Sequence, residues 1–297
     1  MANDLSAYNA QVWVNESLYV VQSNMVAASK VHRNFEQALA QFGDTVNTRK
    51  PATFTAQNKG ATSDVTVQNA TATNVQVVMN KHKEVTFQIF DVEQTKGIKN
   101  LVNEYFRPAA IAIATAADAD VLGLYTDVST NQLTPGGNMN YDTVVDAETK
   151  LNDSKVLPGD RHVIVSSQQK GALSKDQYFI NAAATGNGGQ ALRTGILIPV
   201  AGFTSLSMDQ NTVSASGKHH NLAFHSNAFA FVTRLMQTAT ENTPGAIIAV
   251  QQFEGLGMRV VYSYNPTKLA SQVTVDIFYG VKTLDETFAV DILTDVA

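Results

Sequence analysis

The stretch TNVQVVMNKHKEVTFQIFD, residues 73–91, constrains the fold most, because apolar and polar residues alternate along it on both sides of a short charged segment. Such alternation predicts strands that each bury one face. We predict a hairpin whose loop is Lys81, His82 and Lys83, since a four-residue loop would mix the two faces. In this register the facing pairs are Met79 and Val85, Val77 and Phe87, and Val75 and Ile89 on the apolar side, with Gln76 and Gln88 on the other.

Burying the apolar face of this hairpin would contribute roughly 9–18 kcal/mol as an upper limit. The flanking segments 52–74 and 91–97 are rich in Thr, Asn, Gln and Ala and offer little to cover it. Either the rest of the chain folds over the hairpin or another molecule covers it.

The composition excludes several kinds of function. The 297 residues suffice for one large or two modest domains, and the net charge of -5 with 21 scattered Lys and Arg provides no basic surface for a nucleic acid backbone. The absence of cysteine excludes disulfides, a thiolate nucleophile and a zinc–thiolate site. No run approaches ~18 consecutive apolar residues and the first residues do not form a signal peptide, so we expect no membrane segment and synthesis in the cytoplasm.

The first part of the chain predicts one helix followed by an arm. Apolar residues recur at steps of three and four over residues 17–42, with His32 in the apolar stripe, and Gly43 follows as a stop signal. An extended strand opened by Pro51 then leads to the hairpin. Residues 50–94 therefore predict a long, polar, two-stranded arm, which would be marginally stable alone.

A second long helix is predicted over residues 96–125, with Thr95 as its cap. Pro108 lies inside the pattern and removes a backbone donor. We therefore expect either a kink near Glu104 or a helix that restarts at Arg107.

The remainder mixes helices and strands. Helices are predicted at 141–151 and 168–179, strands at 162–167, 196–208, 219–225, 226–236, 257–265, 272–280 and 288–293, and a Gly-rich loop at 180–195. This order predicts an α+β protein without internal repeats.

Candidate metal and phosphate sites are incomplete. His219 and His225 could share one face of a strand that also carries His220, but two imidazoles without a nearby carboxylate are an incomplete ligand set, so we predict no metal site. The glycine-rich segments 186–190 and 135–137 lack the lysine and hydroxyl of a phosphate loop and the context of a dinucleotide site, and we interpret them as loops.

Candidate acid–base and nucleophilic residues are equally unconvincing. Asp118 and Asp120 are two apart on a predicted helix and point in different directions, so we interpret them as exposed helix charges. Ser166 and Ser167 follow a buried strand but lack the glycines of a nucleophile elbow, which favours an ordinary turn.

A basic cluster gives the predicted arm a positive edge. It consists of Arg49, Lys50, Lys59, Lys81 and Lys83. These side chains could be solvated and keep the ribbon from stacking on itself, or they could meet carboxylates on a neighbouring molecule. The apolar hairpin face favours the second interpretation.

This order of elements resembles the major capsid protein of tailed bacteriophages, whose shell fold is shared with encapsulins, and most closely its podovirus coat protein branch. The residues that carry the resemblance are GDTVNTRKPATF (43–54), VVMNKHKEVTFQIFDVEQ (77–94), NLAFHSNAFAFV (221–232) and FEGLGMRVVYSYNPTKLASQVTVDIFYG (253–280).

The resemblance implies a division of the chain. The regions would be an N-terminal arm (1–48), an extended β-hairpin loop reaching over an adjacent subunit (49–94), a long spine helix in a peripheral domain (95–130), an axial α/β domain (131–250), the strands and loop of the peripheral domain (251–284), and a return to the axial domain (285–297). The implied contacts between subunits are Val75, Val77, Met79, Lys81, Lys83, Val85, Phe87 and Ile89 in the extended loop and Asn265, Pro266, Thr267 and Lys268 in the peripheral loop.

The function implied by the resemblance is structural. The chain would self-assemble through hexamers and pentamers into an icosahedral shell that encloses double-stranded DNA without binding it specifically. Its other partners would be a separate scaffolding protein, a portal protein and a possible decoration protein. It would be assembled in the host cytoplasm and reside in the virion, with no active site and no cofactor.

Three alternatives stay open at this stage. They are an encapsulin-like compartment subunit, a phage tail or adhesin protein, and a hydrolase that depends on a residue such as Ser166 or His225. If a neighbouring subunit covers the hairpin, changing Phe87 or Ile89 to Asp should leave the monomer folded but block assembly.

Overall fold

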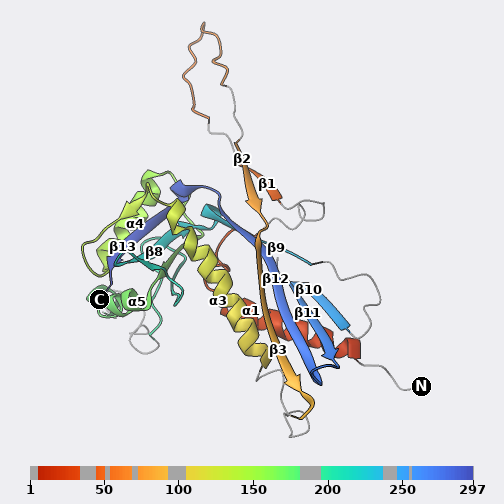
Figure 1. Cartoon of the computed structure of the whole chain (residues 1–297). Coiled ribbons are helices and arrows are strands. Elements are labelled where there is room, and N and C mark those ends of the chain that lie inside the picture. Colours follow the sequence, from red (N-terminus) through yellow and green to blue (C-terminus); the bar gives the residue numbers. More distant parts are fainter. Residues whose placement is uncertain are drawn as a thin grey trace.

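The computed structural model of this chain describes residues 6–33, 45–50, 54–68, 73–92, 105–180, 195–236, 246–253 and 256–296. It is an α+β fold, as predicted, with a ribbon that projects from a body containing two larger sheets (Figure 1). The helices are α1 (Ser6–Asn24), α3 (Arg107–Leu122), α4 (Tyr141–Asp153), α5 (Ser167–Leu173) and α6 (Gln177–Ile180), with short 3-10 turns η3 (Gly123–Asp127), η4 (Ser226–Ala228) and η5 (Glu286–Phe288). The strands are β1 (Thr45–Lys50), β2 (Thr73–Val78), β3 (Lys81–Phe90), β4 (Gln132–Leu133), β5 (Arg161–Val165), β6 (Ser205–Met208), β7 (Ser214–Ala215), β8 (Lys218–His225), β9 (Phe229–Arg234), β10 (Ala246–Phe253), β11 (Leu256–Asn265), β12 (Ala270–Thr283) and β13 (Ala289–Asp295).

The first helix begins and ends earlier than its sequence pattern predicts. The prediction of a helix over 17–42 is wrong, because α1 ends at Asn24. The side chains of Ser23 and Asn24 both donate to the Val20 carbonyl oxygen, and such local bonds compete with helix continuation. The chain then turns, and a carboxylate on α3 accepts the amide hydrogens of the turn. Residues 34–44 lie outside the described part of the chain.

Helix α3 begins at Arg107, the position predicted for a restart, and Tyr105 and Phe106 directly before it are π-helical. Whether a helix precedes them lies outside the described residues. Pro108 lies in its first turn, where the missing amide hydrogen costs nothing. The segment Arg107–Asp127 is long and apolar enough to cross a membrane by composition alone, with a mean hydropathy of 1.3. Here it is a core helix that packs against α1, β3 and β12, and its buried residues are Ala109, Ala110, Ile113, Ala114, Ala117, Asp118, Val121 and Leu122.

The five-stranded antiparallel sheet has the order β10-β11-β12-β3, and β9 pairs with the far end of β12. Helix α1 packs on β10 and β11, and α3 packs on β3 and β12 (Figure 1). Alternate residues of β12, namely Val273, Val275, Ile277 and Tyr279, face this helical layer and are buried. The long strand β12 is therefore the centre of the larger hydrophobic core.

The six-stranded sheet has the order β4-β13-β8-β5-β6, with β7 paired to β8. Its core contains Val144 and Leu151 from α4 and Leu173 from α5. The predicted helix at 141–151 is confirmed, and Asn140 and Thr143 form a capping box at its start. The predicted strands at 162–167 and 219–225 correspond to β5 and β8.

The predicted hairpin over 73–91 is wrong. Strand β2 pairs antiparallel with β1, from Thr45 opposite Val78 to Lys50 opposite Thr73. Strand β3 pairs antiparallel with β12, from Ala270 opposite Phe90 to Tyr279 opposite Lys81. The two strands thus belong to different sheets, and residues 81–83 are the first residues of β3 instead of a loop.

The projecting ribbon is the arm of this chain. Strands β1 and β2 form its two-stranded base, and residues 54–68 extend beyond them, away from both larger sheets (Figure 1). Residues 54–67 are exposed along their whole length. We refer to residues 45–78 as the arm and to Val78–Lys81 as its root.

Candidate functional site

A small apolar cluster seats the base of the arm on the body. Val46 of β1 and Val77 of β2 face each other across the ribbon, and both are buried. Together with Met79 they pack against Ala230 and Val232 of β9. Because this cluster is small and separate from the two larger cores, it fixes the base without extending the body's core into the arm.

The arm root crosses the long strand β12 at a glycine. A Cβ atom added to Gly280 would lie 2.3 Å from the Val78 carbonyl oxygen and 3.3 Å from the Met79 Cα. Real Cβ atoms do not approach a backbone so closely, so only glycine permits this crossing. Gly280 therefore sets how closely the root can lie on the sheet.

A single carboxylate receives three donors where the root becomes β3. Asp120 of α3 accepts hydrogen bonds from Lys81 Nζ at 3.1 Å and from the Tyr279 hydroxyl at 2.5 Å, and Lys83 Nζ lies 3.5 Å away. Burial alone would raise the pKa of Asp120, but the hydrogen bonds from Tyr279 and Lys81 hold it below its ordinary value. Burial and the bond to Asp120 together raise the pKa of Tyr279.

The lysines of the predicted positive edge therefore do not act together. Lys81 and Lys83 lie on the body and pair with α3, so their prediction as the tip of the arm is wrong. Lys59 lies on residues 54–68, which we call the outer arm, and is exposed. Arg49 and Lys50 lie at the end of β1, where their backbone pairs with β2.

The outer arm exposes apolar side chains. Phe54, Val65 and Val67 are 66%, 69% and 82% exposed. The side-chain amide of Gln68 bonds the backbone of Thr55 on both its donor and acceptor sides and thereby ties the two legs together. Exposed large apolar residues gathered on a projecting segment are typical of a contact surface.

The far end of the five-stranded sheet carries a second exposed segment. The turn between β11 and β12 contains Pro266, Thr267 and Lys268, all exposed, and the Asn265 side chain accepts from the amides of Thr267 and Lys268 at 3.0 and 3.3 Å. Beside it lie the exposed side chains of Leu269, Tyr264, Phe90 and Val92. The Tyr264 hydroxyl bonds Asp91, which links the turn to the end of β3.

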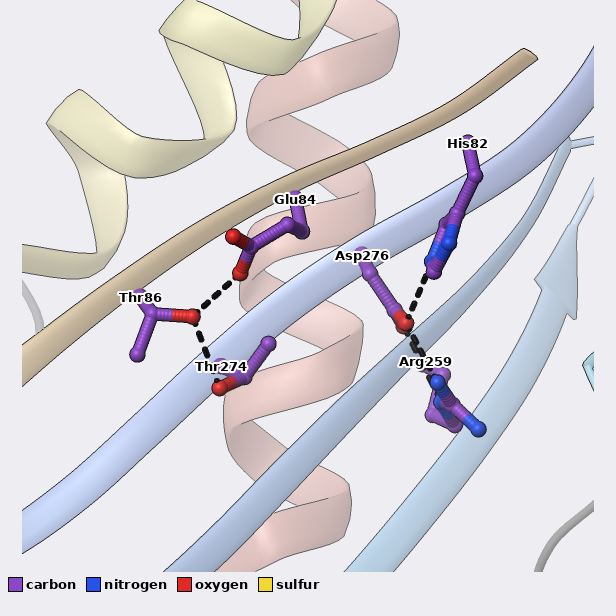
Figure 2. Close-up of polar contacts among 6 residues, drawn as sticks. All are labelled: His82, Glu84, Thr86, Arg259, Thr274 and Asp276. Carbon is purple, nitrogen blue, oxygen red and sulfur yellow. Dashed lines mark hydrogen bonds and ion pairs between the residues drawn. The ribbon is translucent and has the colours of Figure 1, made fainter.

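The sheet face opposite the helices is polar near β3. Figure 2 shows Asp276 of β12 between His82 of β3 and Arg259 of β11, with His82 Nε2 3.0 Å and Arg259 Nε 3.1 Å from the carboxylate. On the same face of the sheet, the hydroxyls of Thr86 and Thr274 lie 2.9 Å apart. These contacts tie β3 to β12 across the face that α1 and α3 leave uncovered.

Three apolar residues predicted at a subunit contact are covered by the chain itself. Val77, Met79 and Ile89 are at most 4% exposed, so for these three residues it is the rest of the chain, and not another molecule, that covers the predicted apolar face. Val85 and Phe87 are half-buried and pack against the larger core, with the Phe87 ring stacked on Tyr105. Val77 and Met79 are covered by β9, whereas pairing with the distant strand β12 places the apolar face of β3 under the helical layer.

Val75 of β2 remains half-buried on the base of the arm. Of the described residues in the predicted extended-loop contact, Val75 is the one that lies on the arm and is also partly exposed. Its role between subunits stays a prediction.

The interpretation of Asp118 and Asp120 as exposed helix charges is wrong. Asp118 is 1% exposed and accepts the amide hydrogens of Val26 and Ala28 at 2.7 and 2.8 Å. Burial raises the pKa of Asp118 to about 6, against the lowering effect of these two bonds. Asp118 thus anchors the turn after α1, whereas Asp120 anchors the arm root.

The histidines of β8 have structural partners. His220 Nδ1 lies 2.8 Å from Asp291 Oδ2, and the ring stacks against Tyr125. His219 contacts Ser214, and the His225 Nδ1 accepts the Asn227 amide hydrogen. Within the described ranges no group of three or more His, Asp or Glu side chains could hold a metal ion.

The remaining candidates also have local roles. Ser166 caps α5 by accepting the Gln169 amide hydrogen, and Ser167 is the first residue of that helix. Gly136 adopts a positive φ of 74° in the segment 135–137 that precedes α4. The glycine-rich segment 186–190 lies outside the described residues.

The fold is similar to those of chains in solved phage structures, among them the following three. A chain of Mycobacterium phage Che8 has a TM-score of 0.68 and 19% identity, with 90% of each chain covered. A chain in the capsid of cyanophage P-SCSP1u has a TM-score of 0.60 and 11% identity, covering 86% of this chain and 85% of that one. A chain in the capsid of Ralstonia phage GP4 has a TM-score of 0.59 and 12% identity, again covering 86% and 85%.

This chain has the phage capsid fold. The predicted fold class is thereby confirmed, while the podovirus branch stays a prediction. No model of a known protein family matches the sequence, and no curated protein sequence matches it.

Proposed function

We propose that this chain is the subunit of an icosahedral phage capsid, self-assembling through hexamers and pentamers around double-stranded DNA. The observation that carries the proposal is the phage capsid fold, which spans 86–90% of the chain in the matches to Che8, P-SCSP1u and GP4. The subunit would act through its surfaces, without catalysis or a cofactor, and would reside in the virion after assembly in the host cytoplasm.

The arm is the first proposed contact between subunits. Its outer segment exposes Phe54, Val65 and Val67, which the chain's own body does not cover. We propose that these residues, with Val75 at the base, lie on an adjacent subunit in the shell. Because a closed shell repeats each contact many times, a modest area per contact is sufficient for stability.

The turn at the far end of the five-stranded sheet is the second proposed contact. Asn265, Pro266, Thr267 and Lys268 project there. The Asn265 side chain holds the turn in one conformation through its two backbone bonds, so the turn is preorganised for contact. The neighbouring apolar side chains of Leu269 and Val92 would add buried area.

The domain division is proposed with boundaries revised to follow the sheets. Because β3 lies in the five-stranded sheet, we assign residues 45–78 to the extended loop and 81–90 to the peripheral domain. β9 and β10 lie in the same sheet, so 229–236 and 246–284 also belong to the proposed peripheral domain. The other proposed regions are 1–44 for the N-terminal arm, 95–130 for the spine helix, 131–228 for the axial domain and 285–297 for the return to the axial domain.

The proposed partners beyond the chain itself are a scaffolding protein, a portal protein and a possible decoration protein. The chain carries a net negative charge, because 21 Lys and Arg are outnumbered by 26 Asp and Glu. This charge supports a container that does not bind its DNA tightly.

Electron microscopy of the purified chain, alone and co-expressed with its scaffolding protein, tests the proposal. We expect closed shells of uniform diameter. Tubes or trimers would instead support a tail or adhesin protein, and shells that package an enzyme without DNA or a portal would support a compartment. A chain that stays monomeric at every concentration, ionic strength and scaffold ratio contradicts the proposal.

A further inference from the structure

The arm leaves the body through three consecutive fixed points. The Val78 carbonyl crosses Gly280, Met79 is buried in the small apolar cluster, and Lys81 bonds Asp120. Asn80, between the last two, is exposed. The β2 leg of the arm therefore meets the body through a segment of four residues, which helps to set the direction of the arm.

The charges at this point interrupt an apolar row. Inward-facing positions of β3 carry Val85, Phe87 and Ile89 toward the helices, but the same row continues as Lys83 and Lys81 as it approaches the root. On α3, the facing position is Asp120, whose side chain is 18% exposed, while those of Lys81 and Lys83 are 37% and 40% exposed. The apolar row thus gives way to ion pairs where the arm begins.

We propose that Asp120, Lys81 and Lys83 form a charge lock that sets the direction of the arm. Half-exposed ion pairs contribute little to the free energy of folding, but several donors on one carboxylate fix the geometry of the groups that they join. Tyr279 contributes the third donor and is itself buried, so the carboxylate is held from the sheet as well as from the root.

The consequence for assembly rests on the proposed function. If the arm contacts a neighbouring subunit, its direction determines where that neighbour sits. A second ion pair near the same end of α3 serves as a comparison. Lys282 Nζ lies 3.9 Å from the Asp127 carboxylate, and both side chains are exposed. That pair joins η3 to β12 and does not touch the arm root.

Hydrogen exchange of the unassembled chain tests the lock directly. In the Asp120→Asn variant we expect several-fold faster amide exchange across residues 78–84, which are the root and the first residues of β3. Exchange in the two larger hydrophobic cores should stay unchanged. The matched control Asp127→Asn should exchange like wild type. A second variant, Lys81→Met with Lys83→Met, removes the same lock from the other side and should show the same change, with no further increase when Asp120→Asn is added.

Equal exchange at residues 78–84 in wild type and both lock variants would overturn the inference. If Asp120→Asn fails to fold because its amide NH2 faces the donors of Tyr279 or Lys81, the double lysine variant decides the question alone. Particle diameter is the second measurement, and the lock variants should give a broader distribution than Asp127→Asn. Since exchange is measured before assembly, a wild-type chain that never forms shells contradicts the proposed function and leaves the lock to be judged by exchange.

Discussion

Strands β2 and β3 are neighbours in the sequence and read alike, yet they have different surroundings. β3 lies at the edge of a five-stranded sheet and packs Val85, Phe87 and Ile89 toward helices. Among the described strands β2 pairs with β1 alone, and it follows a segment in which Val65 and Val67 are exposed. Alternation of apolar and polar residues shows that a strand has one face to bury, but it does not show which partner buries it.

The largest effect that distinguishes the two regions is expected at Ile89, which is 2% exposed. Placing a carboxylate there buries a charge without a partner, so Ile89→Asp should destabilise the monomer by about 4 kcal/mol or more. Circular dichroism during thermal unfolding measures this. The result would reverse the expectation, drawn from the predicted hairpin, that the monomer stays folded.

The matched control is Val67→Asp on the outer arm, where the side chain is 82% exposed. Its melting temperature should equal that of wild type. An Ile89→Asp monomer as stable as Val67→Asp would mean that β3 is not part of the body's core.

A smaller effect is expected from the buried carboxyl that anchors the turn after α1. Burial raises the pKa of Asp118 from 3.8 to about 6 in the folded state, so the folded chain binds this proton more tightly than the unfolded chain. The stabilisation is therefore fully present below pH 3.8 and is lost as the pH rises through about 6. Between about pH 4.5 and about pH 7.5, wild type should lose roughly 2 kcal/mol relative to Asp118→Asn.

Denaturant unfolding of both proteins at the two pH values measures this difference. Asp118→Asn keeps the shape of the side chain but does not titrate, so it removes the contributions of all other groups from the comparison. A wild-type curve parallel to that of the variant would mean that Asp118 stays ionised and that the bonds from Val26 and Ala28 outweigh burial.

The crossing of the arm root over β12 gives a third test. Gly280→Ala places a Cβ against the Val78 carbonyl, which should cost about 1–3 kcal/mol and shift the root. Gly171→Ala is the control, because its Cβ meets no atom within 4 Å and lies in α5, where alanine is the better helix former. Chemical denaturation should show Gly280→Ala below wild type and Gly171→Ala at or above it.

Local elements followed from the sequence where one short segment decides the outcome. Pro108 predicted either a kink near Glu104 or a helix start at Arg107, and α3 begins at Arg107. Asn140 with Thr143 caps the helix that the sequence placed at 141–151. The overall order of elements was also sufficient to predict the phage capsid fold. In these cases the information is contained in residues close together in the chain.

Pairings between distant residues could not be predicted in the same way. The partner of β3 is β12, about 190 residues later, and Asp120 and Tyr279, which meet one another at the arm root, lie 159 apart. Lys81 and Lys83 looked like a charged loop because the carboxylate that pairs with them is on another element. Lysines that continue an apolar row, as at these two positions, were the available signal that an acidic side chain on another element faces the strand.

The smallest effect on stability, and the most specific for assembly, is expected on the outer arm. Val65→Ser combined with Val67→Ser replaces side chains that are 69% and 82% exposed, so the unfolding free energy should change by less than about 0.5 kcal/mol. If a neighbouring subunit covers these side chains, light scattering should show slower assembly and a higher critical concentration. Thr66→Ser, between them, is the control. Assembly equal to wild type in the double variant would remove Val65 and Val67 from the proposed contact, while the phage capsid fold itself would be unaffected.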